Sequence, residues 1–242
     1  MWRTTFTLIL SIIIFVGITT AQDDFDPQEV MENLEWAENV TITFEDDFMI
    51  FESDGIPNHE VGDFPNRSNP NRIEEQAYRF YIPLYPELAE EPSETPMGPI
   101  GIAITGALFF NQYNALHQDA VEVEVFDDCN GHPDQRGLYH YHQNPICISE
   151  TLDEPDQHSF LIGYAFDGFP IYGPLGEKGE PPDDLNKCNG HVGATPENED
   201  EIYHYHVTAE PPYVLGCYAG IVEARNIQGP PANEEKPPPP RR

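Results

Sequence analysis

The chain has 242 residues, of which 43 are acidic and 11 basic, and its formal net charge is −32. A surface this acidic repels a polyanion, so nucleic acid is excluded as a partner. Cations are the natural partners, namely calcium, a mineral face, extracellular matrix components or basic proteins. The simpler alternative is that the acidic residues serve solubility alone.

The first 21 residues are predicted to be a secretory signal peptide. Arg3 precedes an apolar run from Leu8 to Ile18, and Thr19-Thr20-Ala21 offers small residues for cleavage before Gln22. The apolar run is shorter than the ~20 residues that a membrane span needs, and no later stretch qualifies. We therefore expect a secreted, extracellular chain of 242 − 21 = 221 residues with no transmembrane segment.

Residues 22–99 are predicted to form an acidic N-terminal region with some strands. Residues 22–38 suit a short helix or a mobile arm, whereas apolar alternation predicts strands in residues 40–51 and 74–84. His59 lies in a turn-rich stretch and is interpreted as a lone surface histidine. Residues 86–99 are rich in proline and glutamate, which is typical of a connector at a domain boundary.

From Gly101 the chain contains an internal repeat. Residues 101–110 align with residues 163–172 at an offset of 62, and Cys129 is separated from Cys188 by 59 residues. Similar offsets favour one duplicated unit over two chance motifs. We predict one domain at residues 100–222 with repeat units at about 101–150 and 163–220. Each unit has a hairpin signal (Thr105-Gly106 and Asp167-Gly168), and residues 121–126 alternate like a strand.

The repeat carries a histidine motif. Cys-Asn-Gly-His at 129–132 and 188–191 is followed by Tyr-His-Tyr-His at 139–142 and 203–206. Side chains alternate faces along a strand, so the two histidines of each Tyr-His-Tyr-His lie on one face and can reach a common metal ion. The histidine of the turn is the expected third ligand, carried close to the other two when a cysteine bridge ties the loop back. The predicted ligands are His132, His140, His142, His191, His204 and His206.

Three imidazoles suit zinc or copper and leave one coordination position free. The six histidines form two separate sites or, about a pseudo-twofold axis, one central site. Asp127, Asp128 and Asp167 are candidate partners for an imidazole N–H. The structural alternative is a hydrogen-bonded β core without metal. In that core the motif tyrosines are packed aromatics with solvated hydroxyls rather than metal ligands.

Four cysteines in a secreted chain predict two disulfides, with three possible pairings. We favour Cys129–Cys147 and Cys188–Cys217, each of which closes its own copy of the motif. Zinc thiolate binding is a weaker alternative, because the sequence has no Cys-x-x-Cys and the compartment is oxidising. Asn39 and Asn66 begin glycosylation sequons, which predicts a glycoprotein.

The paired Cys-Asn-Gly-His and Tyr-His-Tyr-His blocks, with Asp167 to Pro174 between them, resemble the YHYH domain family over residues 101–220. The resemblance implies a domain found in secreted or surface proteins, and it implies no particular activity.

The expected fold is mainly β: one disulfide-stapled domain built from an internally duplicated β unit, with acidic N-terminal strands and a disordered Pro-rich tail at residues 223–242. Two functions stay open. One is a non-enzymatic extracellular matrix component that binds cations, with biomineralization in calcified tissue as its sharpest form and calcium at the acidic surface. The other is a metal-dependent extracellular hydrolase or oxidoreductase with histidine-ligated zinc or copper. We prefer the matrix function because it accounts for more of the chain, and no catalytic residue is assigned.

Overall fold

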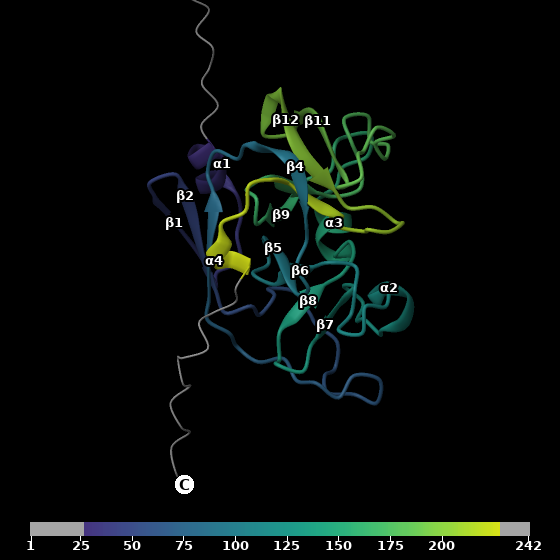
Figure 1. The fold of residues 1–242 in the computed structure, drawn as a ribbon. Helices are drawn as coiled ribbons and strands as arrows, with labels where there is room; N and C mark the ends of the chain where they lie inside the picture. The colour runs from purple at the N-terminus through teal and green to yellow at the C-terminus, as the bar shows by residue number, and fades with distance from the viewer. Residues whose placement is uncertain (1–26, 228–242) are drawn as a thin grey trace, which may run out of the picture.

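The computed structural model describes residues 27–227 and is mainly β (Figure 1). The strands are β1 (Val40–Glu45), β2 (Phe48–Ser53), β3 (Tyr78–Pro83), β4 (Leu88–Glu94), β5 (Pro99–Ala103), β6 (Leu108–Phe110), β7 (Gly131–Pro133), β8 (Tyr139–Tyr141), β9 (Leu161–Ala165), β10 (Pro170–Tyr172), β11 (Gly190–Thr195), β12 (Asn198–His206) and β13 (Cys217–Gly220). The helices are α1 (Pro27–Asn33), α2 (Ala120–Val123), α3 (Ile146–Leu152) and α4 (Ala224–Ile227). Within residues 27–227, none of these helices has the length and apolar character needed to cross a bilayer.

An eight-stranded sheet organises the molecule in the order β11-β12-β10-β9-β5-β6-β8-β7. The central pair, β5 and β9, is antiparallel. Outward from it, each half repeats one pattern: an antiparallel hairpin, then a parallel pair, then a second antiparallel hairpin. In Figure 1 the sheet runs from β11 and β12 at the top to β7 at the bottom. The strand order is therefore symmetric about its centre, and the two Tyr-His-Tyr-His segments lie in its two opposite halves.

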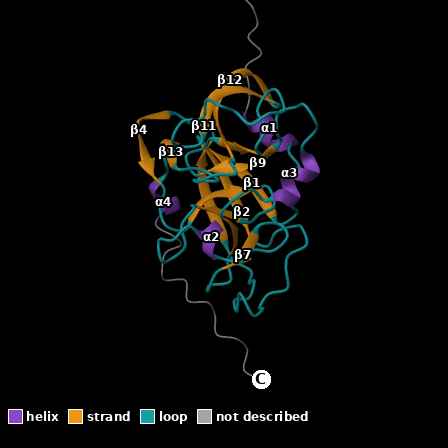
Figure 2. Ribbon diagram, turned by 90° about the vertical axis from the view of Figure 1, so that its right-hand side faces the viewer, coloured by secondary structure: helices purple, strands orange, loops and turns teal. Residues whose placement is uncertain are grey.

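A three-stranded sheet, β1-β2-β3, packs against this arrangement, and β4 pairs with β13. Phe80 of β3 contacts Phe166 with ring centroids 4.5 Å apart, and Trp36 contacts Phe51 at 5.2 Å. The N-terminal strands thus share one hydrophobic core with the repeat region. Figure 2 shows the strands in the middle of the molecule, with short helices and loops around them.

Two N-terminal segments differ from expectation. Residues 40–51 are not a single strand: the chain reverses at Asp46, which has a φ of 52°, and β1 pairs with β2. Residues 86–99 are not only a connector, because β4 lies within them and pairs with β13 through Glu94 and Cys217. A short acidic stretch is predicted to be a loop because the sequence does not show which distant strand pairs with it.

Two later segments also differ. Residues 121–126 alternate like a strand, yet Ala120–Val123 form helix α2, because the Asp119 side chain caps the N–H groups of Val121 and Glu122. Residues 224–227, predicted to belong to a disordered tail, form helix α4, where the Asn226 amide bonds both backbone groups of Tyr81. The predicted signal peptide and residues 228–242 lie outside the described residues.

Candidate metal centres

The Cys-Asn-Gly-His turns position one histidine of each motif. Asn130 and Asn189 take positive φ values of 63° and 65°, which lets the chain reverse tightly into β7 and β11. In the resulting hairpins His132 lies directly opposite His140, and His191 lies opposite His204. Side chains directly opposite each other on antiparallel strands share a face. The hairpin register, rather than the disulfide, therefore brings the third histidine to the other two.

The first cluster consists of His132, His140 and His142, all buried. The Nε2 atom of His140 is 3.1 Å from that of His132 and 3.0 Å from that of His142. Phe110 stacks on the His140 ring with centroids 3.9 Å apart, and Phe126 packs on His132 at 4.5 Å. Both phenylalanines also contact the His142 ring edge-on, so aromatic packing restrains the three rings whose Nε2 atoms converge.

The other ring nitrogen of each histidine faces a hydrogen-bond acceptor. Nδ1 of His132, His140 and His142 bonds the backbone carbonyl oxygens of Val125, Leu138 and Asn111 respectively. A carbonyl oxygen can only accept, so each Nδ1 carries the hydrogen and each neutral ring presents an Nε2 lone pair. Three lone pairs facing one another repel unless a cation lies between them. In this tautomer Nε2 is free to bind a metal ion, while the Nδ1–H bond fixes the orientation of the ring.

Burial keeps these rings neutral. It lowers the pKa of His142 to about 4 and holds that of His140 well below 6.5, with the neighbouring imidazoles adding to the effect at His140. It also lowers the pKa of His132, against the opposing effect of Glu124. At neutral pH a proton is therefore a poor substitute for a metal ion between the Nε2 atoms.

The second cluster contains three buried histidines, one of which the sequence analysis missed, and the half-buried His191 beside them, which approaches His204 but lies outside the mutually close set. His158 joins His204 and His206 in a buried set whose ligand atoms all lie within 4.8 Å of one another. Nε2 of His204 is 3.0 Å from that of His206, 3.1 Å from that of His191 and 3.4 Å from that of His158. His158 lies three residues before β9. It belongs to neither of the two repeated histidine motifs. The one sequence signal that could have found it is its position just before residues 163–172, which repeat residues 101–110.

The second cluster uses the same tautomer. Nδ1 of His204, His206 and His158 bonds the carbonyl oxygens of Ile202, Gly173 and Ser159. Nδ1 of His191 bonds the Asp184 carboxylate at 2.7 Å. Burial lowers the pKa of His204 to about 4 and that of His206 to about 3. The six predicted ligands therefore fall into two separate clusters, and the alternative of one central six-histidine site is wrong.

Two of the aspartates predicted to bond an imidazole have other partners. Asp127 accepts from the backbone N–H groups of Cys129 and Gly131 and from the Tyr139 hydroxyl at 2.8 Å. Asp167 accepts from the Tyr205 hydroxyl at 2.5 Å. Asp128 is exposed. Main-chain carbonyls and Asp184 hold the imidazoles instead, and carbonyl acceptors leave no signature in a sequence.

The motif tyrosines lie on the opposite strand face from the histidines, as alternation predicts. They are buried, and their hydroxyls bond protein groups: Tyr141 contacts Thr105 at 3.2 Å and Tyr203 accepts from Asn186 at 3.1 Å. The Tyr139 ring covers Gly131 so closely that a Cβ there would overlap it. This close approach explains the glycine of the Cys-Asn-Gly-His turn in the first copy, and Tyr203 covers Gly190 in the same way.

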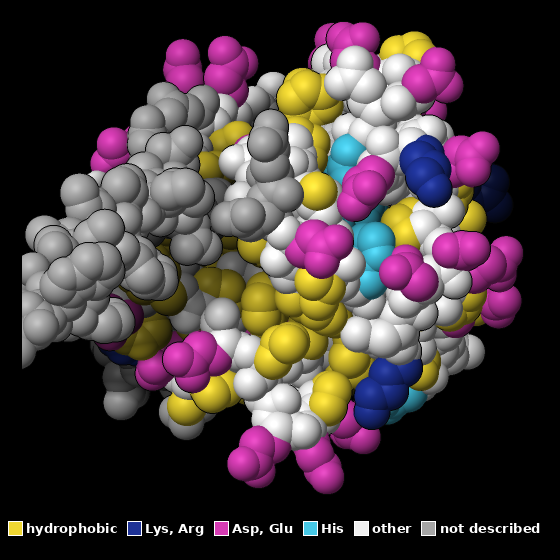
Figure 3. Space-filling model, turned by 90° about the horizontal axis from the view of Figure 1, so that it is seen from above, with side chains coloured by type: hydrophobic (Ala, Val, Ile, Leu, Met, Phe, Trp, Pro, Cys, Tyr) yellow, Lys and Arg dark blue, Asp and Glu magenta, His cyan; other side chains and the backbone are white. Residues whose placement is uncertain are grey.

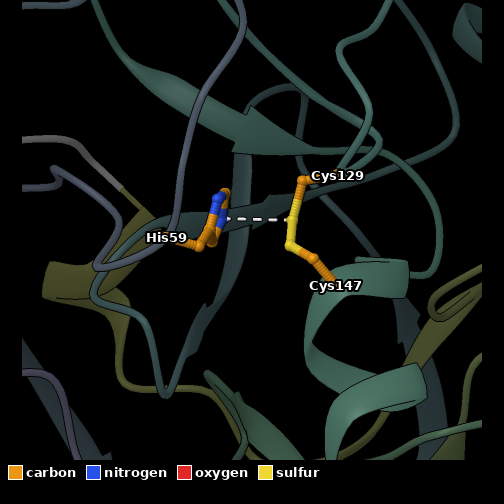
Figure 4. A group of neighbouring side chains, drawn as sticks. All are labelled: His59, Cys129 and Cys147. Carbon is orange, nitrogen blue, oxygen red and sulfur yellow. Dashed lines mark hydrogen bonds between the residues drawn. A yellow bond between two sulfur atoms is a disulfide. The ribbon is translucent and has the colours of Figure 1, made fainter.

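The two disulfides join the favoured pairs, Cys129–Cys147 and Cys188–Cys217. His59 is not a lone surface histidine, because its Nε2 is 2.6 Å from the Tyr141 hydroxyl. The same nitrogen is 3.3 Å from the Cys129 sulfur, as Figure 4 shows beside the Cys129–Cys147 disulfide. Disulfide sulfurs offer no thiolate to a metal, so this group is a packing contact rather than a metal site.

A cavity of about 610 Å³ opens over the first cluster, and His132, His140 and His142 all line it. Glu124, at the end of α2, also lines the cavity, and its carboxylate is 3.3 Å from Nε2 of His132. A second cavity, of about 620 Å³, is lined by Tyr172, Glu197 and Tyr203, and no described histidine is among its lining residues. Of these two cavities, only the first exposes a histidine cluster.

The acidic residues are scattered. Figure 3 shows Asp and Glu side chains spread between apolar ones over one face, with few basic side chains there. Of the two sequon asparagines, Asn66 is exposed, whereas the half-buried Asn39 amide donates to Asp54 and to the Ile56 carbonyl. Asn66 is therefore the more accessible position for a glycan.

Fold and site together define a disulfide-bonded, mainly β protein with two buried histidine clusters. The family described as YHYH protein matches residues 79–181 and 178–220, which is more than half of the chain. The chain therefore belongs to the YHYH protein family, and the predicted resemblance is confirmed, with a match that also includes β3 and β4. No curated protein and no solved structure matches the chain.

Proposed function

We propose that this YHYH-family protein binds a transition metal ion, zinc or copper, at each of its two histidine clusters. The observation that carries the proposal is the convergence of Nε2 atoms whose rings each donate Nδ1–H to an acceptor. In the first cluster the Nε2 atoms are 3.0 and 3.1 Å apart. Around a tetrahedral ion at about 2.0–2.1 Å from each nitrogen, the ligand atoms lie roughly 3.3 Å apart. The clusters therefore need only a small expansion to accept the ion.

The metal-free alternative is a β core satisfied by hydrogen bonds. It accounts well for the tyrosine face, where every motif hydroxyl bonds a protein partner. It accounts poorly for the histidine face, because two Nε2 lone pairs 3.0 Å apart share no hydrogen. Polar atoms buried without a partner are costly, and a bound cation removes that cost. Neutral imidazoles suit zinc and copper rather than calcium.

The wider role of the chain is inferred from features outside the clusters. We propose a secreted, extracellular protein whose domain arose by duplication of a β unit, which the symmetric strand order and the two intra-unit disulfides support. The acidic excess supports a matrix component that binds calcium or mineral through its surface. The scattered distribution of that acid favours weak, delocalised cation binding over a templating face.

A second function is favoured by the cavity. Catalytic zinc sites have three protein ligands and an open position for water, whereas structural sites are closed. The first cluster has three histidines at a cavity of about 610 Å³, with the Glu124 carboxylate at the same place. This arrangement supports a metal-dependent hydrolytic or oxidative activity there, in which the three histidines would hold the ion and Glu124 would act as the proton acceptor beside it.

Metal content tests the proposal. The protein should be purified from a secreting host without chelator or affinity tag and measured by mass spectrometry of its metals. We expect about two zinc or copper ions per chain, one after His140→Ala with His142→Ala, and none when His204→Ala and His206→Ala are added. His117→Asn is the matched control, since His117 is an exposed histidine with a φ of 59° that asparagine tolerates. A folded wild-type protein without transition metal would refute the proposal.

A further inference from the structure

The two histidine clusters are not equivalent. Resting on the metal binding proposed above, we infer that the second cluster is a closed site with four histidine ligands, whereas the first keeps one coordination position open to its cavity for an exchangeable small ligand. The first site would take a water molecule or a small anion. The second would take none.

His158 is the residue that closes the second cluster. It is 8% exposed, its Nδ1 is 2.7 Å from the Ser159 carbonyl oxygen, and its Nε2 is 3.4 Å from that of His204. Edge contacts with Tyr172 at 4.9 Å help fix the ring. A buried imidazole has the geometry of a ligand when its Nδ1 is committed to a carbonyl oxygen and its Nε2 lies close to the ligand atoms of His204 and His206. His191, 3.1 Å from His204, supplies the fourth imidazole. Four imidazoles complete the coordination of a tetrahedral ion.

The first cluster has no counterpart of His158. At the repeat offset of 62 residues, His158 corresponds to Pro96, which has no ring nitrogen to offer as a ligand. The Pro96 carbonyl oxygen instead accepts from the Asn111 amide at 2.8 Å. On this side the cavity of about 610 Å³ reaches all three histidines. An ion bound there would have three imidazoles and a fourth position facing the cavity.

Glu124 decides which ligand fits the open position. Its carboxylate, about one-third exposed, is 3.3 Å from Nε2 of His132. It can accept a hydrogen bond from a metal-bound water, or bind the ion itself until another ligand displaces it. Asn114 and Arg136 also line the cavity and offer donors to a small anion. The cavity and Glu124 therefore make the first cluster the site of ligand exchange, whereas His158 makes the second cluster a structural site.

Cobalt(II) provides the test, because its visible absorption reports both coordination number and added ligands. The full-length protein should be loaded with cobalt, its metal content measured, and azide titrated. We expect two cobalt ions per chain, of which one responds to azide. His140→Ala should abolish the azide response while leaving the second cobalt band unchanged. His158→Ala should open the second cluster and raise the response to two ions per chain.

The possible failures are distinguishable. If two cobalt ions bind and both respond to azide in the wild-type protein, or neither does, the inference is overturned while the proposed metal binding stands. If His158→Ala binds two cobalt ions and only one responds, His158 is not a ligand and the inference is again overturned. If a folded wild-type protein takes up no cobalt, the proposed metal binding fails, and the inference fails with it. Far-ultraviolet circular dichroism checks folding of each variant.

Discussion

The two halves of the eight-stranded sheet contain the same motif in different surroundings. In each half an antiparallel hairpin sets one histidine opposite the first histidine of Tyr-His-Tyr-His. The first half adds a cavity, and the second adds a fourth histidine. The comparison separates the features needed to build the cluster, which both halves share, from the features that determine what each cluster does.

The hydrogen bonds that hold the Cys-Asn-Gly-His turn and its histidine are present in both halves, although different residues supply the acceptors. Asp127 and Asn186 occupy equivalent positions, and each accepts from the N–H groups of the cysteine and glycine of its own turn. The acceptor for the turn histidine is the Val125 carbonyl in one half and the Asp184 carboxylate in the other. In both halves an oxygen acceptor occupies each of these positions, although the residue or group that supplies the oxygen differs.

The largest expected effect on stability comes from the disulfides. Cys129–Cys147 spans 18 residues and Cys188–Cys217 spans 29, so loop entropy gives similar contributions of about 3 and 3.5 kcal/mol. Replacing each pair with alanines should lower the free energy of unfolding, measured in urea, by nearly the same amount. If only one replacement were costly, the two halves would not be held by equivalent crosslinks.

The next effect concerns metal affinity, and it should be asymmetric. His140→Ala leaves two histidines in the first cluster, whereas His204→Ala leaves three in the second. We therefore expect about a 100-fold or larger loss of zinc affinity at the first cluster and a smaller loss, about 10-fold, at the second. Competition titration with a chromophoric chelator measures both. Equal losses would contradict the four-ligand description of the second cluster.

The buried histidines make stability pH-dependent in both halves, but one further pH-dependent contribution, that of Asp167, belongs to the second half alone. Burial raises the pKa of Asp167 to about 6 from its ordinary 3.8, and its counterpart in the first half, Thr105, does not titrate. Between pH 4 and 6 the folded protein binds a proton that the unfolded chain does not, so the contribution of Asp167 to stability is highest at low pH and falls as pH rises to about 6. The difference in unfolding free energy between wild type and Asp167→Asn should shift by roughly 2–3 kcal/mol across this range.

The pH experiment has a clear failing result. Urea unfolding at closely spaced pH values, for wild type and Asp167→Asn in parallel, isolates the contribution of this carboxyl. A constant difference from pH 3 to 8 would show that Asp167 is not buried as a titrating acid. If the stability that Asp167 contributes increased rather than fell as the pH rises, the pKa of Asp167 would be lowered in the folded protein, as in a polar environment.

The smallest effect is expected at the tyrosine hydroxyls. Tyr205 donates to Asp167 at 2.5 Å and accepts from the Ala219 N–H at 2.8 Å, so Tyr205→Phe leaves a buried carboxylate with one donor fewer. Tyr141 shares weaker neutral partners, Thr105 and His59. We expect Tyr205→Phe to cost about 2 kcal/mol and Tyr141→Phe about 1 kcal/mol in chemical unfolding. A reversed order would mean that the Asp167–Tyr205 bond contributes little.

The sequence was sufficient for features that are local. Period-two alternation places His140 and His142 on one face, because it depends on neighbours in the chain. His132 was also predicted as a ligand, but its approach was attributed to the disulfide, whereas the hairpin register brings it opposite His140. The two disulfide pairs follow from closure of each repeat unit. The repeated residue pattern also anticipates the symmetric strand order, although the parallel pairings β6–β8 and β10–β12 appear only in the structure.

The sequence was insufficient where distant segments meet. His158 approaches His204 across 46 residues, and His59 approaches Tyr141 across 82. Residues 121–126 show how local signals conflict: alternation indicated a strand, but the Asp119 cap gives a helix. The misread segment covers the first cluster, since it supplies the Glu124 carboxylate, the Val125 carbonyl and the Phe126 ring.

The central claim is that Nε2 atoms of two histidine clusters bind metal, and anomalous X-ray diffraction at the zinc edge tests it most directly. Crystals of the protein grown with zinc should show two strong peaks per chain, one about 2.0–2.1 Å from Nε2 of His132, His140 and His142, and the other at the same distance from Nε2 of His204 and its neighbours. Peaks only at surface carboxylates, with the histidine rings turned to hydrogen-bond one another, would contradict the account.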